Sequence, residues 1–241
     1  LSGISPHASD KDIRIRGGDG EDNDDETDRD SDDSTMDDDA VVDFSMRDLE
    51  AFSLPSVGLT TPGQWQRIQV LSLRSNRLTD LADLGLSALP NVIEVDLACN
   101  HFSGSIRRKC IPNSVQRLDL SFNDFTDLSG LITCTNILAL NLSHNSIKNT
   151  DYLPGRIEIL DASFNILSSA FSLRVLALCP RITSLCLVGN PVTTRVPDWR
   201  QRILNFLPNL MEVDNVPVPK GIVVGAINLY LIGRTQSLSF F

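Results

Sequence analysis

The sequence lacks the residue groupings that most enzymes and metal sites need. Its five cysteines stand apart, with no CxxC pair and no cysteine–histidine cluster, which argues against a zinc site and against a disulfide framework. Scattered cysteines of this kind favour a reducing, cytoplasmic compartment. No phosphate-binding glycine loop, GxSxG elbow or HExxH motif occurs, and His101 and His144 have no acid or nucleophile at motif spacing. We therefore expect neither catalysis nor a cofactor, metal or small-molecule substrate.

Long apolar runs are also missing. The segment from Ile222 to Ile232 is apolar but has only 11 residues, too few to span a bilayer. The N-terminus has no apolar core of a signal sequence. The single basic run, Arg107 to Lys109, has no aromatic residues interleaved with it, which argues against direct nucleic-acid binding.

The excess of negative charge belongs to one end of the chain. Residues 1–50 contain 18 Asp and Glu against 5 Lys and Arg, whereas residues 51–241 contain 13 against 16. A segment so acidic cannot bury enough apolar surface to offset its ordering entropy, so residues 1–40 are predicted to be disordered. Thr27, Ser34 and Thr35 each precede an Asp by three residues, so the tail is either a phosphorylation target or an unmodified solubilising segment.

Repetition dominates the rest of the chain. The pattern LxxLxLxxNxL occurs six times, and successive asparagines are 24, 23, 22, 20 and 25 residues apart. We number these units 1 to 6 after their asparagines, which are Asn76, Asn100, Asn123, Asn145, Asn165 and Asn190. The pattern predicts an α/β solenoid with a curved parallel sheet on its concave face and irregular or helical segments on its convex side.

Each residue type has a physical reason. The two leucines around the central x of a unit point inward from a short strand, while the x positions face solvent. The asparagine follows where the chain turns away, and its amide both donates and accepts, so it can satisfy backbone groups of neighbouring turns. We expect the six asparagines to form a structural ladder.

The segments on either side of the repeats are predicted to cap them. Val42, Met46, Leu49 and Phe52 have helical spacing and are expected to cover unit 1, or alternatively to form an amphipathic helix for a partner. The expected division is an acidic tail over 1–40, an N-terminal cap over 41–64, repeats over 65–195, a C-terminal cap over 196–216 and a tail of unassigned role over 217–241.

The repeat register also assigns the solvent-facing positions of the sheet. The x between the strand leucines predicts an acidic row along the concave face, comprising Asp96, Asp119, Asn141 and Asp161. The x before the asparagine predicts an aromatic ridge beside it, comprising Phe122, His144 and Phe164, with Glu94 and Arg117 as flanking positions. Such a surface suits a protein ligand with basic groups, although phenylalanines before the asparagine also often serve packing.

Several motifs resemble those of a known family. The repeats are similar to leucine-rich repeats of the short class near 22 residues, which has phosphatase-regulating, spliceosomal and ciliary or axonemal members. Gly189-Asn190-Pro191, the segment from Trp199 to Leu204, and Leu207-Pro208-Asn209-Leu210 resemble the C-terminal cap of that class. The segment from Leu173 to Ile182 resembles the ciliary members.

The resemblance implies a mode of action without a ligand. Our leading hypothesis is a non-catalytic scaffold or adaptor that holds a protein partner on its concave face, in a ciliary or dynein-related setting. The alternatives are a regulatory subunit of a protein phosphatase, or a ribonucleoprotein component that holds an RNA-binding protein.

Overall fold

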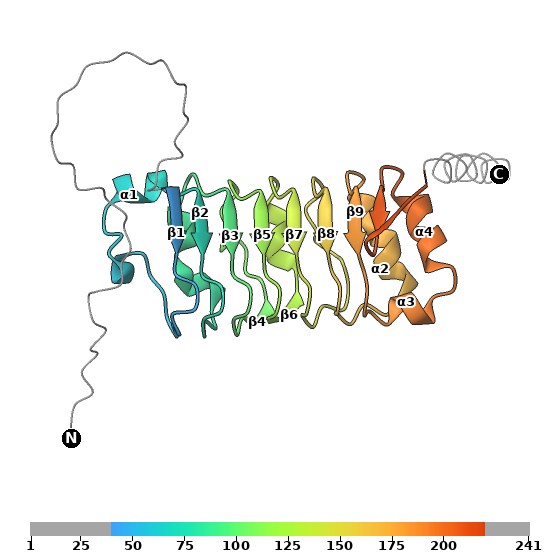
Figure 1. Ribbon diagram of the computed structural model, residues 1–241, viewed down its shortest axis with the longest axis horizontal. Helices are drawn as coiled ribbons and strands as arrows, with labels where there is room; N and C mark the ends of the chain where they lie inside the picture. The colour runs from blue at the N-terminus through green and yellow to red at the C-terminus, as the bar shows by residue number, and fades with distance from the viewer. Residues whose placement is uncertain (1–39, 220–241) are drawn as a thin grey trace, which may run out of the picture.

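A computed structural model describes residues 40–219 of the chain (Figure 1). The acidic tail up to residue 39 and the apolar segment from Ile222 to Ile232 lie outside the described residues, so the predictions made for them stay predictions.

The described residues form a solenoid around one long sheet (Figure 1). Its strands run in the order β1-β2-β3-β5-β7-β8-β9-β10-β11, and every neighbouring pair is parallel except β10 with β11. The strands of units 1 to 6 are β2 (Val70–Ser72), β3 (Glu94–Asp96), β5 (Arg117–Asp119), β7 (Ala139–Asn141), β8 (Ile159–Asp161) and β9 (Ser184–Cys186). The predicted leucine-rich-repeat fold is confirmed.

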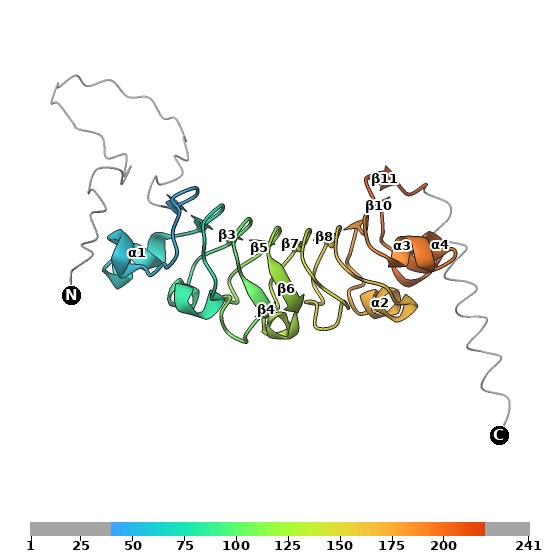
Figure 2. The same ribbon diagram turned by 90° about the horizontal axis from the view of Figure 1, so that it is seen from below.

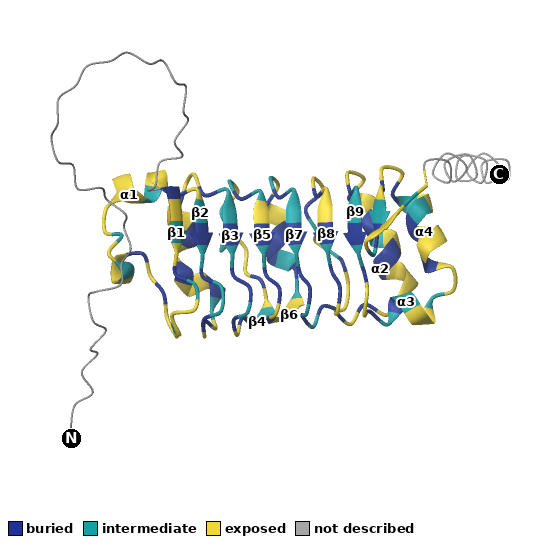
Figure 3. Cartoon of the chain, in the orientation of Figure 1, coloured by how far each residue is buried: buried dark blue, intermediate teal, exposed yellow. Residues whose placement is uncertain are grey.

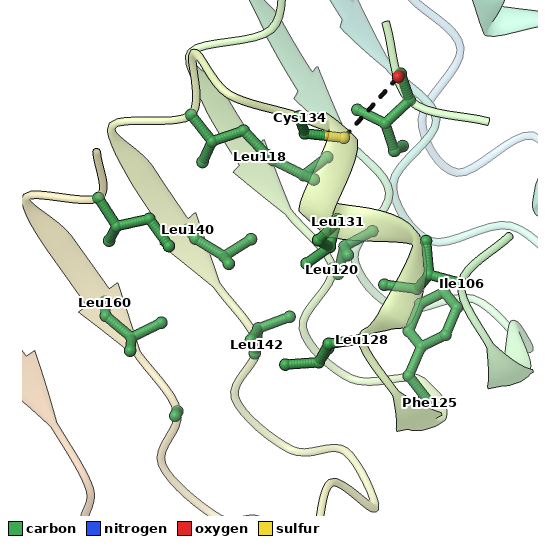
Figure 4. Packing of buried hydrophobic residues seen from close by; sticks show 14 of the residues in the cluster. Ile106, Leu118, Leu120, Phe125, Leu128, Leu131, Cys134, Leu140, Leu142 and Leu160 are labelled. Carbon is green, nitrogen blue, oxygen red and sulfur yellow. Dashed lines mark hydrogen bonds between the residues drawn. The ribbon is translucent and has the colours of Figure 1, made fainter. Parts of the chain in front are cut away.

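The inward leucines build a continuous core behind this sheet. Leu118, Leu140 and Leu160 are paired in register on neighbouring strands, and each is buried. Figure 4 shows their side chains pointing to the same side as Leu120 and Leu142, toward the helical turn that contains Leu131. Because one unit buries its leucines only against its neighbours, the array is stable as a whole.

The convex side is formed by short helices and turns (Figures 2 and 3). They place buried leucines against the sheet while their outer residues stay exposed. These elements are η3 (Leu81–Leu84), η4 (Leu86–Ala88), η5 (Ser129–Thr133), α2 (Ala170–Val175) and η6 (Leu176–Leu178). A small parallel pair, β4 (Ser103–Ser105) and β6 (Asp124–Asp127), lies where units 2 and 3 leave the sheet.

The N-terminal segment corrects one prediction. The stretch from Val42 to Phe52 was expected to be helical, but β1 (Val41–Asp43) is a strand that pairs in parallel with β2. Val42 and Phe44 alternate inward as strand residues do, whereas Met46, which the helical spacing assigned to the packed face, is 78% exposed. The helical spacing was coincidental, because β2 offers unpaired backbone groups that a strand can satisfy and a helix cannot.

This segment is therefore an additional unit at the edge of the array. Phe44 is buried against Phe52, with ring centroids 5.6 Å apart, and Arg47 stands where the other units have asparagine. The next elements are η2 (Pro55–Val57) and α1 (Pro62–Arg67), the latter begun by a capping box between Thr61 and Gln64.

The C-terminal end is covered by helices and a hairpin. These elements are α3 (Val192–Arg195), α4 (Trp199–Phe206), β10 (Glu212–Val213) and β11 (Val216–Pro217). Ile203 of α4 and Leu207 are buried, and β10 continues the parallel sheet beside β9. The apolar end of unit 6 is therefore shielded.

The asparagines form a buried ladder through the turns. The amide of Asn123 donates to the carbonyls of Leu97, Leu120 and Ser121, and its oxygen accepts from the backbone of Phe102. Asn100, Asn145, Asn165 and Asn190 repeat the arrangement, and Asn76 bonds to the N-terminal unit in the same way. Each asparagine therefore joins its own turn to the preceding one.

Candidate protein-interaction surface

The concave wall of the sheet carries parallel rows of side chains. Asp96 pairs in register with Asp119, Asp119 with Asn141, and Asn141 with Asp161. We call these four residues the aspartate row; each is partly buried. The row runs across the strands, as the spacing of the repeats predicts.

Each member of the aspartate row also has a local structural role. One side-chain oxygen of Asp96, Asp119, Asn141 and Asp161 accepts the backbone N–H two residues later, at 2.8 to 3.0 Å. This Asx turn fixes the exit of the chain from each strand. An Asp or Asn at these four positions thus has a structural role, although units 1 and 6 have Ser72 and Cys186 there, and the choice of Asp over Asn adds negative charge.

The charges of the row are balanced unevenly along the array. At its N-terminal end, Arg74 lies 3.6 Å from Asp96, and the Arg117 guanidinium donates to Glu94 at 2.7 Å. Burial raises the pKa of Asp96, with nearby Asp119 adding to the effect and the Ala98 amide and Arg74 opposing it. Asp119 and Asp161 have no ion-pair partner among residues 40–219, so uncompensated negative charge lies over units 3 to 5.

A stack of three rings borders the same units. The ring centroids of Phe122 and His144 are 4.1 Å apart and those of His144 and Phe164 are 4.3 Å apart, with interplanar angles of 11° and 15°. We call these residues the aromatic stack. Phe122 and Phe164 remain 48% and 49% exposed. The rings therefore pack against one another, and about half of the surface of each phenylalanine stays exposed to solvent.

The backbone explains where these rings stand. Phe122, His144 and Phe164 have φ values of 54°, 54° and 50°, in the left-handed region that non-glycine residues seldom adopt. The same conformation recurs before the asparagine in the other units, so it belongs to the turn. At the next position along, a Cβ on Gly189 would lie 2.5 Å from the Phe164 ring, so the glycine gives room for the end of the stack.

A shallow hollow of about 350 Å³ lies on the concave wall over β3, β5, β7 and β8. The aspartate row lies along it, and Ala139 and the 52% exposed Ile159 border it on the side away from the aromatic stack. Apolar groups thus flank the carboxylates on both sides. This arrangement provides contact area and charge for a ligand.

The aspartate row, Glu94 and Arg117 line this hollow, and the aromatic stack lies three residues beyond the row at the turns. Two further residues continue the row beyond those predicted from the sequence. Asp43 pairs with Ser72 and so extends the row of central positions at the N-terminal end, and its carboxylate makes the same turn to Ser45. Asp43-Phe44-Ser45 repeats the D-x-S spelling of Asp119-Leu120-Ser121, a signal that was available in the sequence. Asp214 lies at the other end, accepting from the Leu187 backbone and from Arg200.

Two features are absent from residues 40–219. No group of three or more His, Cys, Asp or Glu side chains in this range is placed to hold a metal ion. None of the helices in the same range has the length and hydropathy to cross a bilayer.

Comparison with known sequences places the repeats in a family. The family model for leucine-rich repeats matches residues 112–130. Leucine-rich repeat-containing protein 56 of Rattus norvegicus is 31% identical over 169 residues, 63% of this chain and 30% of that protein. U2 small nuclear ribonucleoprotein A' of Candida glabrata is 34% identical over 100 residues, 40% of this chain and 37% of that protein.

A shorter match joins the chain to a third protein. Dynein axonemal assembly factor 1 of Peromyscus polionotus is 40% identical over 63 residues, 26% of this chain and 10% of that protein. The chain thus spans well under half the length of each of these relatives.

A solved structure supports the same fold. The internalin C2 structure from Listeria monocytogenes superposes with a TM-score of 0.55 at 22% identity, covering 80% of this chain and 79% of that one. The six units in one register, the parallel sheet they build and the match to the family model identify this chain as a leucine-rich-repeat protein.

Proposed function

We propose that this chain is a non-catalytic scaffold that binds a partner protein on its concave wall, and that it acts in the cytoplasm in the assembly of ciliary or flagellar dynein machinery. The observation that carries the binding role is the half-exposed aromatic stack beside the uncompensated carboxylates of Asp119 and Asp161. Aromatic anchors on a preformed wall are typical of protein interfaces.

The ciliary setting has narrower support. The match to a dynein axonemal assembly factor spans 63 residues, and the segment from Leu173 to Ile182 has the resemblance described above. In the fold, this segment contains the end of α2 and all of η6, on the convex side and away from the concave wall. The ciliary proposal therefore rests on likeness of sequence, and the binding proposal rests on the surface.

A second function is favoured by one comparison. The match to a U2 small nuclear ribonucleoprotein subunit supports a ribonucleoprotein component in which the solenoid holds an RNA-binding protein. The remaining alternative is regulation of a phosphatase. It is supported by the resemblance of the repeats to a class that has phosphatase-regulating members.

Affinity capture of the tagged chain from an extract of ciliated cells tests these proposals. The scaffold proposal predicts enrichment of axonemal dynein chains or their assembly factors, identified by mass spectrometry. Spliceosomal proteins would favour the ribonucleoprotein role, and a phosphatase catalytic subunit the regulatory one.

The capture also needs a matched variant pair. Phe122→Ala with Phe164→Ala removes the exposed rings of the concave wall, and Phe171→Ala removes a 61% exposed ring from α2 on the convex side. We expect the first variant to lose the partner and the second to retain it. Equal capture by both would refute binding on the concave wall.

A further inference from the structure

We infer that the occupant of the concave wall is an amphipathic helix bearing two cationic side chains two helical turns apart, with apolar side chains between them. This inference rests on the proposed function and names the kind of segment that the wall receives.

The wall offers three parallel strips over units 3 to 5. The carboxylates of Asp119 and Asp161 lie on the central strip, with Asn141 between them. The aromatic stack forms one flank, while the opposite flank consists of Arg117, which is paired with Glu94, in unit 3 and of Ala139 and Ile159 in units 4 and 5. A ligand that fits must present charge along its midline and apolar groups on both sides of it.

The exposed parts of the rings favour apolar side chains on the part of the ligand that contacts the aromatic stack. Stacking covers both faces of His144 and one face each of Phe122 and Phe164, and Gly189 also lies against the Phe164 ring, which leaves the ring edges and the outer face of Phe122 to solvent. Ring edges carry partial positive charge, so a cation is not attracted to them, whereas aliphatic side chains pack well there. The cations of the ligand therefore belong over the carboxylates.

Charge complementarity sets the sign and number of the ligand's charges. The carboxylates of Glu94 and Asp96 already have arginine partners on the wall, whereas those of Asp119 and Asp161 have none among residues 40–219. Cationic side chains of the ligand would supply those missing partners. Arginine suits the position best, because its planar fork can bind a carboxylate with two hydrogen bonds.

The spacing of the two carboxylates indicates a helix. Asp119 and Asp161 lie two strands apart, about 10 Å at ordinary strand separation. Residues i and i+7 of an α-helix share one face and are about 10.5 Å apart along its axis. Residues i+3 and i+4 fall between them on either side of the midline, so one would rest on the aromatic stack and the other on Ala139 and Ile159.

A designed peptide tests this without knowledge of the natural partner. The probe is an 18-residue helical peptide with Arg at i and i+7 and Leu at i+3 and i+4. Its controls carry citrulline for both arginines, or the second Arg moved to i+5. The readout on the full chain is the imidazole proton resonance of His144, because this ring lies at the centre of the aromatic stack.

The His144 resonance distinguishes peptide binding on the concave wall from peptide binding to the acidic tail. The chain has three histidines, of which His7 reports on the N-terminal tail and His101 lies outside the aromatic stack. We expect the arginine peptide to shift the His144 resonance, and both control peptides to bind at least tenfold more weakly by that signal. An unmoved His144 resonance, or equal shifts with the citrulline peptide, would overturn the inference.

The matched protein variant is Asp119→Asn with Asp161→Asn. Asn141 shows that an amide makes the same Asx turn, so this variant keeps the turns; it removes both charges together with the hydrogen bond that Asp119 accepts from Asn141. We expect the peptide affinity to fall at least tenfold, and an unchanged affinity would overturn the inference. Equal capture of a natural partner by the wild type and by this variant would also overturn the inference. The scaffold proposal would still stand in that case.

Discussion

The Asn141 side-chain amide donates to the carboxylate of Asp119 on the neighbouring strand, with 3.0 Å between Nδ2 and Oδ2. The other oxygen of Asp119 and the side-chain oxygen of Asn141 each accept a backbone N–H two residues later. The aspartate row is therefore required by the turns as well as presented to solvent. Substitution of an aspartate in the row by alanine therefore removes a turn hydrogen bond as well as a charge, whereas substitution by asparagine keeps the turn.

Asp161→Ala should destabilise the fold, whereas Asp161→Asn should not. Alanine leaves the Ser163 N–H without its acceptor, which costs about 1 kcal/mol or more, while asparagine keeps that hydrogen bond. Urea denaturation monitored by circular dichroism measures both. Equal stabilities for the two variants would contradict the structural role assigned to the row.

Asn123→Ala should lower the free energy of unfolding by about 3 kcal/mol, because it leaves several buried backbone groups without partners at once. Its control is Asn136→Ala, since the Asn136 amide donates to the Asn113 carbonyl in an exposed position just before the strand of unit 4. We expect the control to lose less than 1 kcal/mol. Hydrogen exchange of the Phe102 amide should quicken only in the Asn123 variant.

Gly189→Ala should disturb the aromatic stack. The new Cβ would meet the Phe164 ring at 2.5 Å and would sit at a φ of 75°, which alanine adopts only with strain. We expect a loss of about 1–2 kcal/mol and a shifted His144 resonance. Gly63→Ala is the control, since nothing lies within 4 Å of its Cβ position. A His144 resonance unchanged in Gly189→Ala would show that the rings do not depend on this glycine.

Cys179 should resist alkylation at neutral pH. Burial raises its pKa to about 11 from an ordinary value of 9.0, so thiolate is scarce in the folded chain. Half-buried Cys99 on the concave wall should react first with iodoacetamide, as peptide mass mapping can show.

The same shift predicts a pH dependence of stability. The unfolded chain ionises Cys179 near pH 9 and the folded chain near pH 11, so the folded state binds the proton more tightly in that window. The contribution to stability is complete below pH 9 and is lost as the pH rises toward 11. Cys179→Ser should flatten this loss in denaturation curves measured between pH 8 and 11.

The fold could be predicted because its pattern is local and repeated. Four apolar positions and an asparagine at a fixed spacing specify which side chains face inward, and stacking of the units then follows. The same register placed Phe122, His144 and Phe164 at the same position of neighbouring units, and it placed Asp119 beside Asn141. No information beyond the order of residues was needed for those neighbours.

The N-terminal unit was missed because its asparagine is replaced by Arg47 and its short apolar stretch fits both a helical and a strand spacing. The unpaired edge of β2 decided between them, and that edge exists only once the sheet has formed.

By itself, the sequence determined the repeat register, the inward leucines, the asparagine ladder and the chemical type of each row on the concave wall, because each depends on spacing along the chain. Only the tertiary structure decided that the three rings stack, that Arg74 and Arg117 neutralise one end of the wall, and that Asp119 and Asp161 have no ion-pair partner among the described residues. These outcomes depend on distances between side chains of different units, and such distances are set by how the units pack.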